Sequence, residues 1–187
     1  ERIQSDGQRW VFEFKRMTNG ATGDSAIVLP NQSINTRTEL TLGGKSLIIF
    51  PSGNSHSPGD LLLWLPDTQV LISGDVVYSD RMPSTNASNL HQWIILLGEL
   101  EQLQPKVVIP GHGNVTDIRG ITRLRDLLNA LWTAVHNGYQ AGMADYEMLA
   151  DVSQALAGFR EDYPGLDEKL KRDISHVYLQ VEAASFK

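Results

Sequence analysis

Three residues whose side chains can bind a metal ion, His56, Asp75 and His112, each follow an apolar run of the sequence. The runs span residues 47–50, 70–73 and 107–109. Apolar runs of this length, bounded by glycine and proline, are typical of buried strands. An α/β protein assembles a site from side chains delivered at strand ends. Because imidazole and carboxylate together suit zinc, iron or manganese, the sequence predicts a metal site built from loops at three strand ends.

The residues around these three candidates form short motifs. His56 begins His-Ser-Pro-Gly-Asp, which ends at Asp60, Asp75 follows a glycine, and His112 stands in Pro-Gly-His-Gly. Each motif alone is weak, because Gly-Asp and Pro-Gly are common at turns. Together and in this order they resemble the metallo-β-lactamase superfamily, and most of all glyoxalase II-like enzymes and the zinc hydrolases of quinoprotein systems. The resemblance runs from about residue 27 to the end of the chain, and includes residues 62–67, 74–78 and 81–83.

The resemblance implies a metal-dependent hydrolase acting on a small-molecule substrate. Two zinc ions about 3.5–4 Å apart would share Asp75, which makes this residue the catalytic candidate as well as a ligand. His56 would bind the first ion and His112 the second. A hydroxide activated by the metals would attack a carbonyl or a related ester, thioester or lactam centre. Asp60 is expected to support the site by orienting His56.

One motif of the family, His-x-His-x-Asp-His, should precede His56, yet residues 1–55 contain no histidine. Since that motif supplies the remaining ligands, we expect the chain to be about half of the fold and inactive alone. It should bind one zinc ion weakly or none, against two in the complete protein. The alternative is a non-catalytic binding or assembly module with a vestigial metal site. The sequence upstream of residue 1 would distinguish the two hypotheses.

Length, net charge and residue composition exclude several other classes of protein and of binding site. A chain of 187 residues is normally one domain, here with an arm (1–25), a strand-rich metal-ligand region (26–115) and a helical region (116–187). The net charge of −6 argues against binding to nucleic acid or anionic membranes. The absence of cysteine excludes disulfides and thiolate metal sites. The apolar runs are too short to span a bilayer, so we expect a soluble protein, either cytoplasmic or exported.

Hydrophobic patterning predicts the order of the elements. Strands are expected at residues 26–29, 39–42, 45–50, 61–65, 69–72 and 107–109, with helices over 88–102, from Asp117, from Asp145 and after Pro164-Gly165. Ser88 and Asp117 are the expected N-caps of the first two helices. This is an α/β fold, the C-terminal half of a metallo-β-lactamase αββα sandwich with a mixed sheet. Half a sandwich leaves an apolar sheet face uncovered, so we expect a homodimer through that face.

Overall fold

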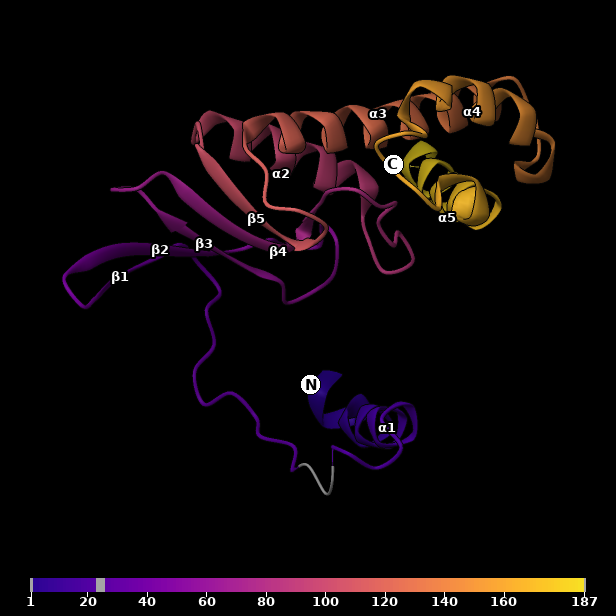
Figure 1. Cartoon of the computed structure of the whole chain (residues 1–187). Helices are drawn as coiled ribbons and strands as arrows, with labels where there is room; N and C mark the ends of the chain where they lie inside the picture. The colour runs from indigo at the N-terminus through magenta and orange to yellow at the C-terminus, as the bar shows by residue number, and fades with distance from the viewer. Residues whose placement is uncertain (1, 23–25, 187) are drawn as a thin grey trace. The chain divides into compact units, whose positions relative to one another are not determined.

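The computed structural model describes residues 2–22 and 26–186, and the chain forms two compact units, residues 1–33 and 34–187 (Figure 1). The first unit contains helix α1 (Arg2–Met17). The side chain of Ile27 packs so closely on Gly7 of this helix that a Cβ at Gly7 would lie 2.8 Å from it. The strand predicted at residues 26–29 is wrong, since this segment pairs with no other strand.

The second unit is built on a five-stranded mixed sheet, which confirms the predicted α/β class. Its strands are β1 (Thr38–Leu42), β2 (Lys45–Pro51), β3 (Leu61–Leu65), β4 (Val70–Tyr78) and β5 (Val107–His112). They lie in sequence order, antiparallel except for the parallel pair β4 and β5. Gly43 and Gly44 form the β1–β2 turn with φ of 57° and 75°, a backbone that glycine adopts without strain.

The helices of the second unit begin between β4 and β5 along the chain, and the first two of them lie over one face of the sheet (Figure 1). They are α2 (Leu90–Gln102), α3 (Ile118–Gln140), α4 (Leu149–Ala155) and α5 (Leu166–Ser185), with short 3₁₀ helices η1 (Asp145–Glu147) and η2 (Ala157–Phe159). Asp117 caps α3 as predicted. Asn89 caps α2 in place of the predicted Ser88, whose hydroxyl donates to the carbonyl of Thr85 instead. Within the described residues, every helix is too short or too polar to cross a lipid bilayer.

The core of the second unit lies between the sheet and the helices. One sheet face contributes a row of buried side chains that pack with α2 and α3, namely Ile48, Leu62, Trp64, Leu71 and Val108. Side chains on the opposite face are also apolar but stay exposed, namely Leu40, Leu42, Leu61, Ile72 and Ile109. Among the described residues of the second unit, helices therefore cover the sheet on one side only.

Helix α5 holds the loop that joins β4 to α2. The Thr85 hydroxyl donates to Asp173 at 2.7 Å, and Lys169 donates to the Met82 carbonyl at 2.6 Å. Farther along the helix, the Nε2 atoms of His176 and Gln180 lie 3.2 Å and 3.1 Å from the Ser88 carbonyl oxygen. The last helix thus fixes the chain segment that leaves the end of β4.

Candidate metal centre

The three metal-capable residues identified in the sequence lie on three neighbouring parts of the sheet. His56 lies in the loop between β2 and β3, Asp75 lies within β4, and His112 is the last residue of β5. The prediction that Asp75 and His112 stand in loops is wrong, because β4 continues past Gly74 and pairs with β5 as far as His112. Asp75 Oδ1 lies 3.5 Å from His112 Nε2, so these two form a close pair.

The orientation of His56 is set by Asp60. His56 Nδ1 lies 2.9 Å from Asp60 Oδ2, and the same carboxylate accepts from the Ser57 amide and hydroxyl. Burial alone would raise the pKa of Asp60, but the hydrogen bonds from His56 and Ser57 outweigh it and lower that pKa. An ionised carboxylate only accepts, so Nδ1 carries a hydrogen, and in the neutral imidazole the lone pair is then on Nε2. This is the state in which an imidazole binds a metal through Nε2.

An irregular stretch of β4 brings Asp75 to His112. The register between β4 and β5 shifts on both sides of Gly74, whose φ is 50°. Such a bulge redirects the side chains that follow it. Gly111 makes room for the carboxylate, since a Cβ there would lie 2.0 Å from Asp75 Oδ1. The local geometry therefore requires glycine before His112.

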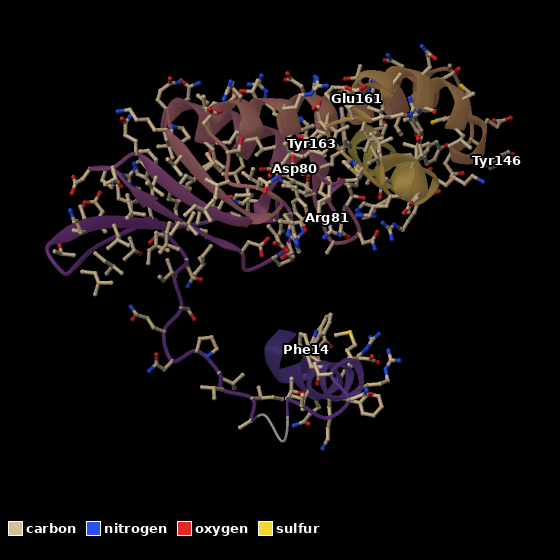
Figure 2. The ribbon with its side chains drawn as sticks, viewed as in Figure 1. Phe14, Asp80, Arg81, Tyr146, Glu161 and Tyr163 are labelled. Carbon is tan, nitrogen blue, oxygen red and sulfur yellow. The ribbon has the colours of Figure 1, made fainter. Side chains whose placement is uncertain are left out.

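The segment after His112 is held against the end of β4. Gly113 has a φ of 90°, and a Cβ there would meet the Ser79 carbonyl oxygen at 1.8 Å. The Ser79 amide donates to the His112 carbonyl at 3.0 Å. Asp80, labelled in Figure 2, accepts from both the backbone amide and the side-chain amide of Asn114. The backbone on either side of His112 is thereby fixed to the loop after β4.

Tyr78 is a residue of this site that the sequence motifs did not identify. Its ring stacks on His112, with centroids 4.9 Å apart, and its hydroxyl lies 3.5 Å from His56 Nε2. Only 5% of the residue is exposed. Burial raises the pKa of Tyr78, and the nearby Asp75 carboxylate raises it further. Its sequence signal was its place in the stretch 74–78 that shares the family resemblance, which does not indicate a side-chain contact across the sheet.

Trp93 of α2 closes another side of His56. The two rings meet edge to face, with centroids 5.2 Å apart. The indole Nε1 donates to the Val76 carbonyl at 2.8 Å, and the whole side chain is buried. His56 is therefore enclosed by an aromatic ring from the helix layer, a tyrosine from β4 and its own carboxylate partner.

The side chains fit zinc by their chemistry, since two imidazoles and a carboxylate are ordinary zinc ligands. Their arrangement is a pair, Asp75 with His112, and a separate His56 whose Nε2 faces Tyr78. Among the residues that the structure describes, no three histidine, aspartate or glutamate side chains are grouped closely enough to hold one ion. The chain therefore offers part of a metal-binding shell.

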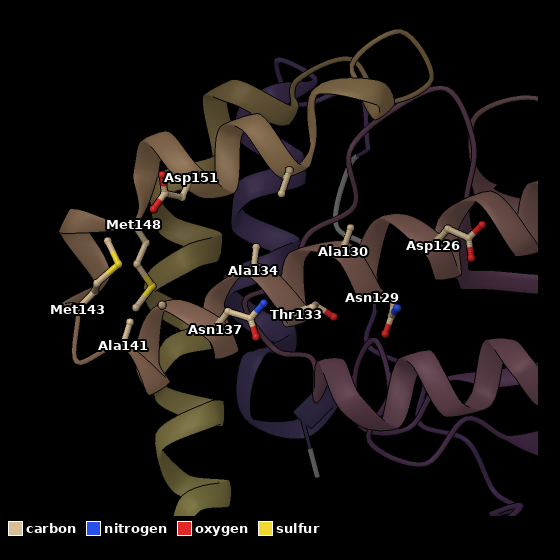
Figure 3. A pocket seen from close by; sticks show the side chains of 12 residues that line it. Asp126, Asn129, Ala130, Thr133, Ala134, Asn137, Ala141, Met143, Met148 and Asp151 are labelled. Atoms are coloured by element: carbon tan, nitrogen blue, oxygen red, sulfur yellow. The ribbon is translucent and has the colours of Figure 1, made fainter.

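A cavity of about 660 Å³ lies elsewhere, between α3 and α4 (Figure 3). Asn129, Thr133 and Asn137 line it from α3, and Met143 and Met148 line it from the following segment. No histidine lines this cavity. It is therefore separate from the candidate metal centre.

A family model described as the metallo-beta-lactamase superfamily matches residues 5–112 of the chain. Over 173 residues the chain is 25% identical to a linear primary-alkylsulfatase of Pseudomonas sp. (strain ATCC 19151), covering 84% of this chain and 33% of that protein. It is 26% identical over 104 residues to a metallo-beta-lactamase type 2 of Bacillus sp. (strain 170), covering 53% of this chain and 40% of that protein. The chain thus spans about a third of the alkylsulfatase and less than half of the lactamase.

Solved structures share the fold. The inverting sec-alkylsulfatase Pisa1 from Pseudomonas sp. superimposes with a TM-score of 0.65 at 19% identity, covering 87% of this chain and 29% of that chain. A metallo-beta-lactamase from Pontibacter korlensis gives a TM-score of 0.50 at 21% identity, covering 63% of this chain and 62% of that chain. The alkylsulfatase therefore matches more of this chain than the lactamase does.

Proposed function

Since the chain belongs to the metallo-beta-lactamase superfamily, we propose that it contributes His56, Asp75 and His112 to the metal centre of a zinc-dependent hydrolase. The observation that carries the proposal is the close pair formed by Asp75, within β4, and His112, the last residue of the adjacent parallel strand β5. Asp60 supports it, because it binds Nδ1 of His56 and so leaves Nε2 as the nitrogen that can bind a metal ion. The non-catalytic alternative is not better supported by these observations.

Each side chain has a defined part in this proposal. His56 Nε2 and His112 Nε2 are the nitrogen donors, and the Asp75 carboxylate lies beside His112 as a donor that two ions can share. A bound zinc ion would supply Lewis acidity and lower the pKa of a water molecule toward about 7. Asp60 would keep His56 in the correct tautomer throughout.

The proposed reaction is hydrolysis at a carbonyl or a related ester, thioester or lactam centre. The alkylsulfatase likeness adds sulfate esters to this list, since it covers more of the chain than the residues matched by the family model. The fold supports many hydrolytic chemistries, so the choice among them is made by assay. A panel of chromogenic esters, a thioester, a β-lactam and an alkyl sulfate separates these classes.

The metal-binding part of the proposal is tested by zinc titration of the chain against a competing chelator. We expect one weakly bound zinc ion, and a loss of this binding in His112→Ala. His136→Ala is the matched control, because His136 is an exposed histidine on α3, away from the site. For activity, the full gene product should turn over a member of the panel and lose that turnover on His112→Ala. Equal zinc binding by wild type and His112→Ala would contradict the proposal.

A further inference from the structure

We infer that Tyr78 is a positioning residue that fixes the imidazoles of both His56 and His112. The inference rests on the proposed function, because it concerns the same metal centre. Tyr78 contacts both histidines through different parts of one side chain, the ring for His112 and the hydroxyl for His56. It thereby joins the isolated histidine to the pair formed by Asp75 and His112.

The contact with His112 is set by backbone pairing. Tyr78 and His112 are direct partners in the parallel ladder of β4 and β5. Their rings stack at an interplanar angle of 29°. Because Tyr78 is buried, its ring has little freedom to rotate, and it offers His112 a fixed surface. The half-exposed His112 imidazole is therefore held on one side by a side chain that cannot readily move.

The contact with His56 comes from the phenol oxygen. At 3.5 Å from Nε2 the hydroxyl makes a long hydrogen bond, in which the O–H donates to the nitrogen lone pair. Asp60 binds the other ring nitrogen, so both nitrogens of His56 have a polar neighbour. The Asp75 carboxylate lies beside the same hydroxyl and is a second acceptor for it. When a metal takes the lone pair of His56, the hydroxyl can donate to Asp75 and keep its place.

A simpler reading treats Tyr78 as a core aromatic, for which a phenylalanine would serve equally well. The two readings differ in the hydroxyl. Tyr78→Phe keeps the ring and the stack on His112 but removes the donor, while Tyr78→Leu removes both. Tyr163→Phe is the matched control, because Tyr163 is also buried but makes no ring contact with a histidine.

The first measurement uses the metal-free chain and the ¹⁵N and ¹H shifts of the histidine rings. In Tyr78→Phe the His56 Nε2 shift should move, because it loses its donor, while the ring protons of His112 keep their shifts. In Tyr78→Leu both histidines should change. Tyr163→Phe should leave both unchanged. Unchanged His56 shifts in Tyr78→Phe would overturn the inference without any statement about zinc.

The second measurement is zinc affinity, together with the absorption spectrum of the cobalt(II)-substituted chain. Loss of a hydrogen bond to a metal ligand typically weakens metal binding 10–100-fold, so we expect about a 10-fold loss in Tyr78→Phe with a nearly unchanged Tm. Tyr78→Leu should lose more and alter the cobalt spectrum. An affinity of Tyr78→Phe within twofold of wild type, beside a clear loss in His112→Ala, would refute the inference and leave the proposed function standing. No zinc binding by the wild-type chain would refute both.

Discussion

The two faces of the sheet are made by alternate residues of the same strands, yet they have opposite environments. Leu62, Leu71 and Val108 are completely buried under the helices. On the other face, Ile72 is 36% exposed, Ile109 is 38% exposed and Leu42 is 72% exposed. Both faces are apolar, whereas a sheet with one face in water normally alternates apolar and polar residues. The strands thus have the composition of a sheet that is buried on both sides.

The contrast teaches that composition alone does not report which face is covered. Strand β3 has the sequence Leu-Leu-Leu-Trp-Leu, and strands β4 and β5 begin with similarly apolar runs. Exposed apolar areas of this kind mark surfaces where another polypeptide binds. We therefore propose that the exposed face is an association surface, while the helix-covered face carries the stability of the second unit.

The largest effect is expected from truncating neighbouring residues on the two faces of β4. Leu71→Ala should lower the free energy of unfolding by about 2–5 kcal/mol, because it leaves a cavity in a packed core. Ile72→Ala, one residue further along, should cost about 1 kcal/mol or less, since the side chain already contacts water. Urea unfolding followed by circular dichroism measures both. Equal losses would mean that the second face is covered in solution.

The sequence predicted the elements that depend on local signals. The hairpin around Gly43 and Gly44 and the start of α3 at Asp117 were predicted correctly, because a turn or a cap needs only nearby residues. The strand at residues 26–29 was predicted wrongly, because an apolar run becomes a strand only when another strand pairs with it. The sequence also did not predict that β4 extends to Tyr78, because this extension depends on pairing with β5 beyond the bulge.

In the candidate site, too, local contacts could be predicted from the sequence and long-range contacts could not. The contact between His56 and Asp60 spans four residues, so a motif can indicate it. The contacts of Tyr78 join residues that are 22 and 34 positions apart, and the contact with His112 depends on the register of two parallel strands. No spacing rule in the sequence carries that information. Long-range side-chain contacts of this kind require the assembled sheet.

A smaller effect should appear in association. We propose that the chain self-associates through its exposed sheet face, and that Ile72→Lys combined with Ile109→Lys weakens this association at least about 10-fold, because a charge buried in an apolar interface is costly. Leu179→Lys, on the exposed side of α5, is the control and should leave association unchanged. Light scattering across micromolar concentrations measures the change. A wild-type chain that stays monomeric throughout this range would contradict the proposal.

The smallest effect concerns Asp173 of α5, a carboxylate that is completely buried. Asp173 accepts from Thr85 through Oδ1, but its Oδ2 has no hydrogen-bond partner. Burial raises the pKa of Asp173 above its ordinary value, so the folded state favours the protonated form. Stability from this group is therefore complete below the unfolded-state pKa of about 3.9 and declines as pH rises toward the folded-state value.

Asp173→Asn tests the direction of this pH dependence, because asparagine resembles the protonated carboxyl group and cannot ionise. We expect the variant to unfold at the same denaturant concentration as wild type, or a slightly higher one, at pH 7. The free energy of unfolding of wild type should decline between about pH 4 and pH 7. The decline should be smaller in the variant, because the variant lacks the ionisable carboxyl group of Asp173. Urea midpoints measured across this range give both quantities. A variant that is less stable than wild type at pH 7 would contradict this expectation. It would mean that Lys169 and Arg172 stabilise the ionised carboxylate of Asp173 enough to outweigh the cost of its burial.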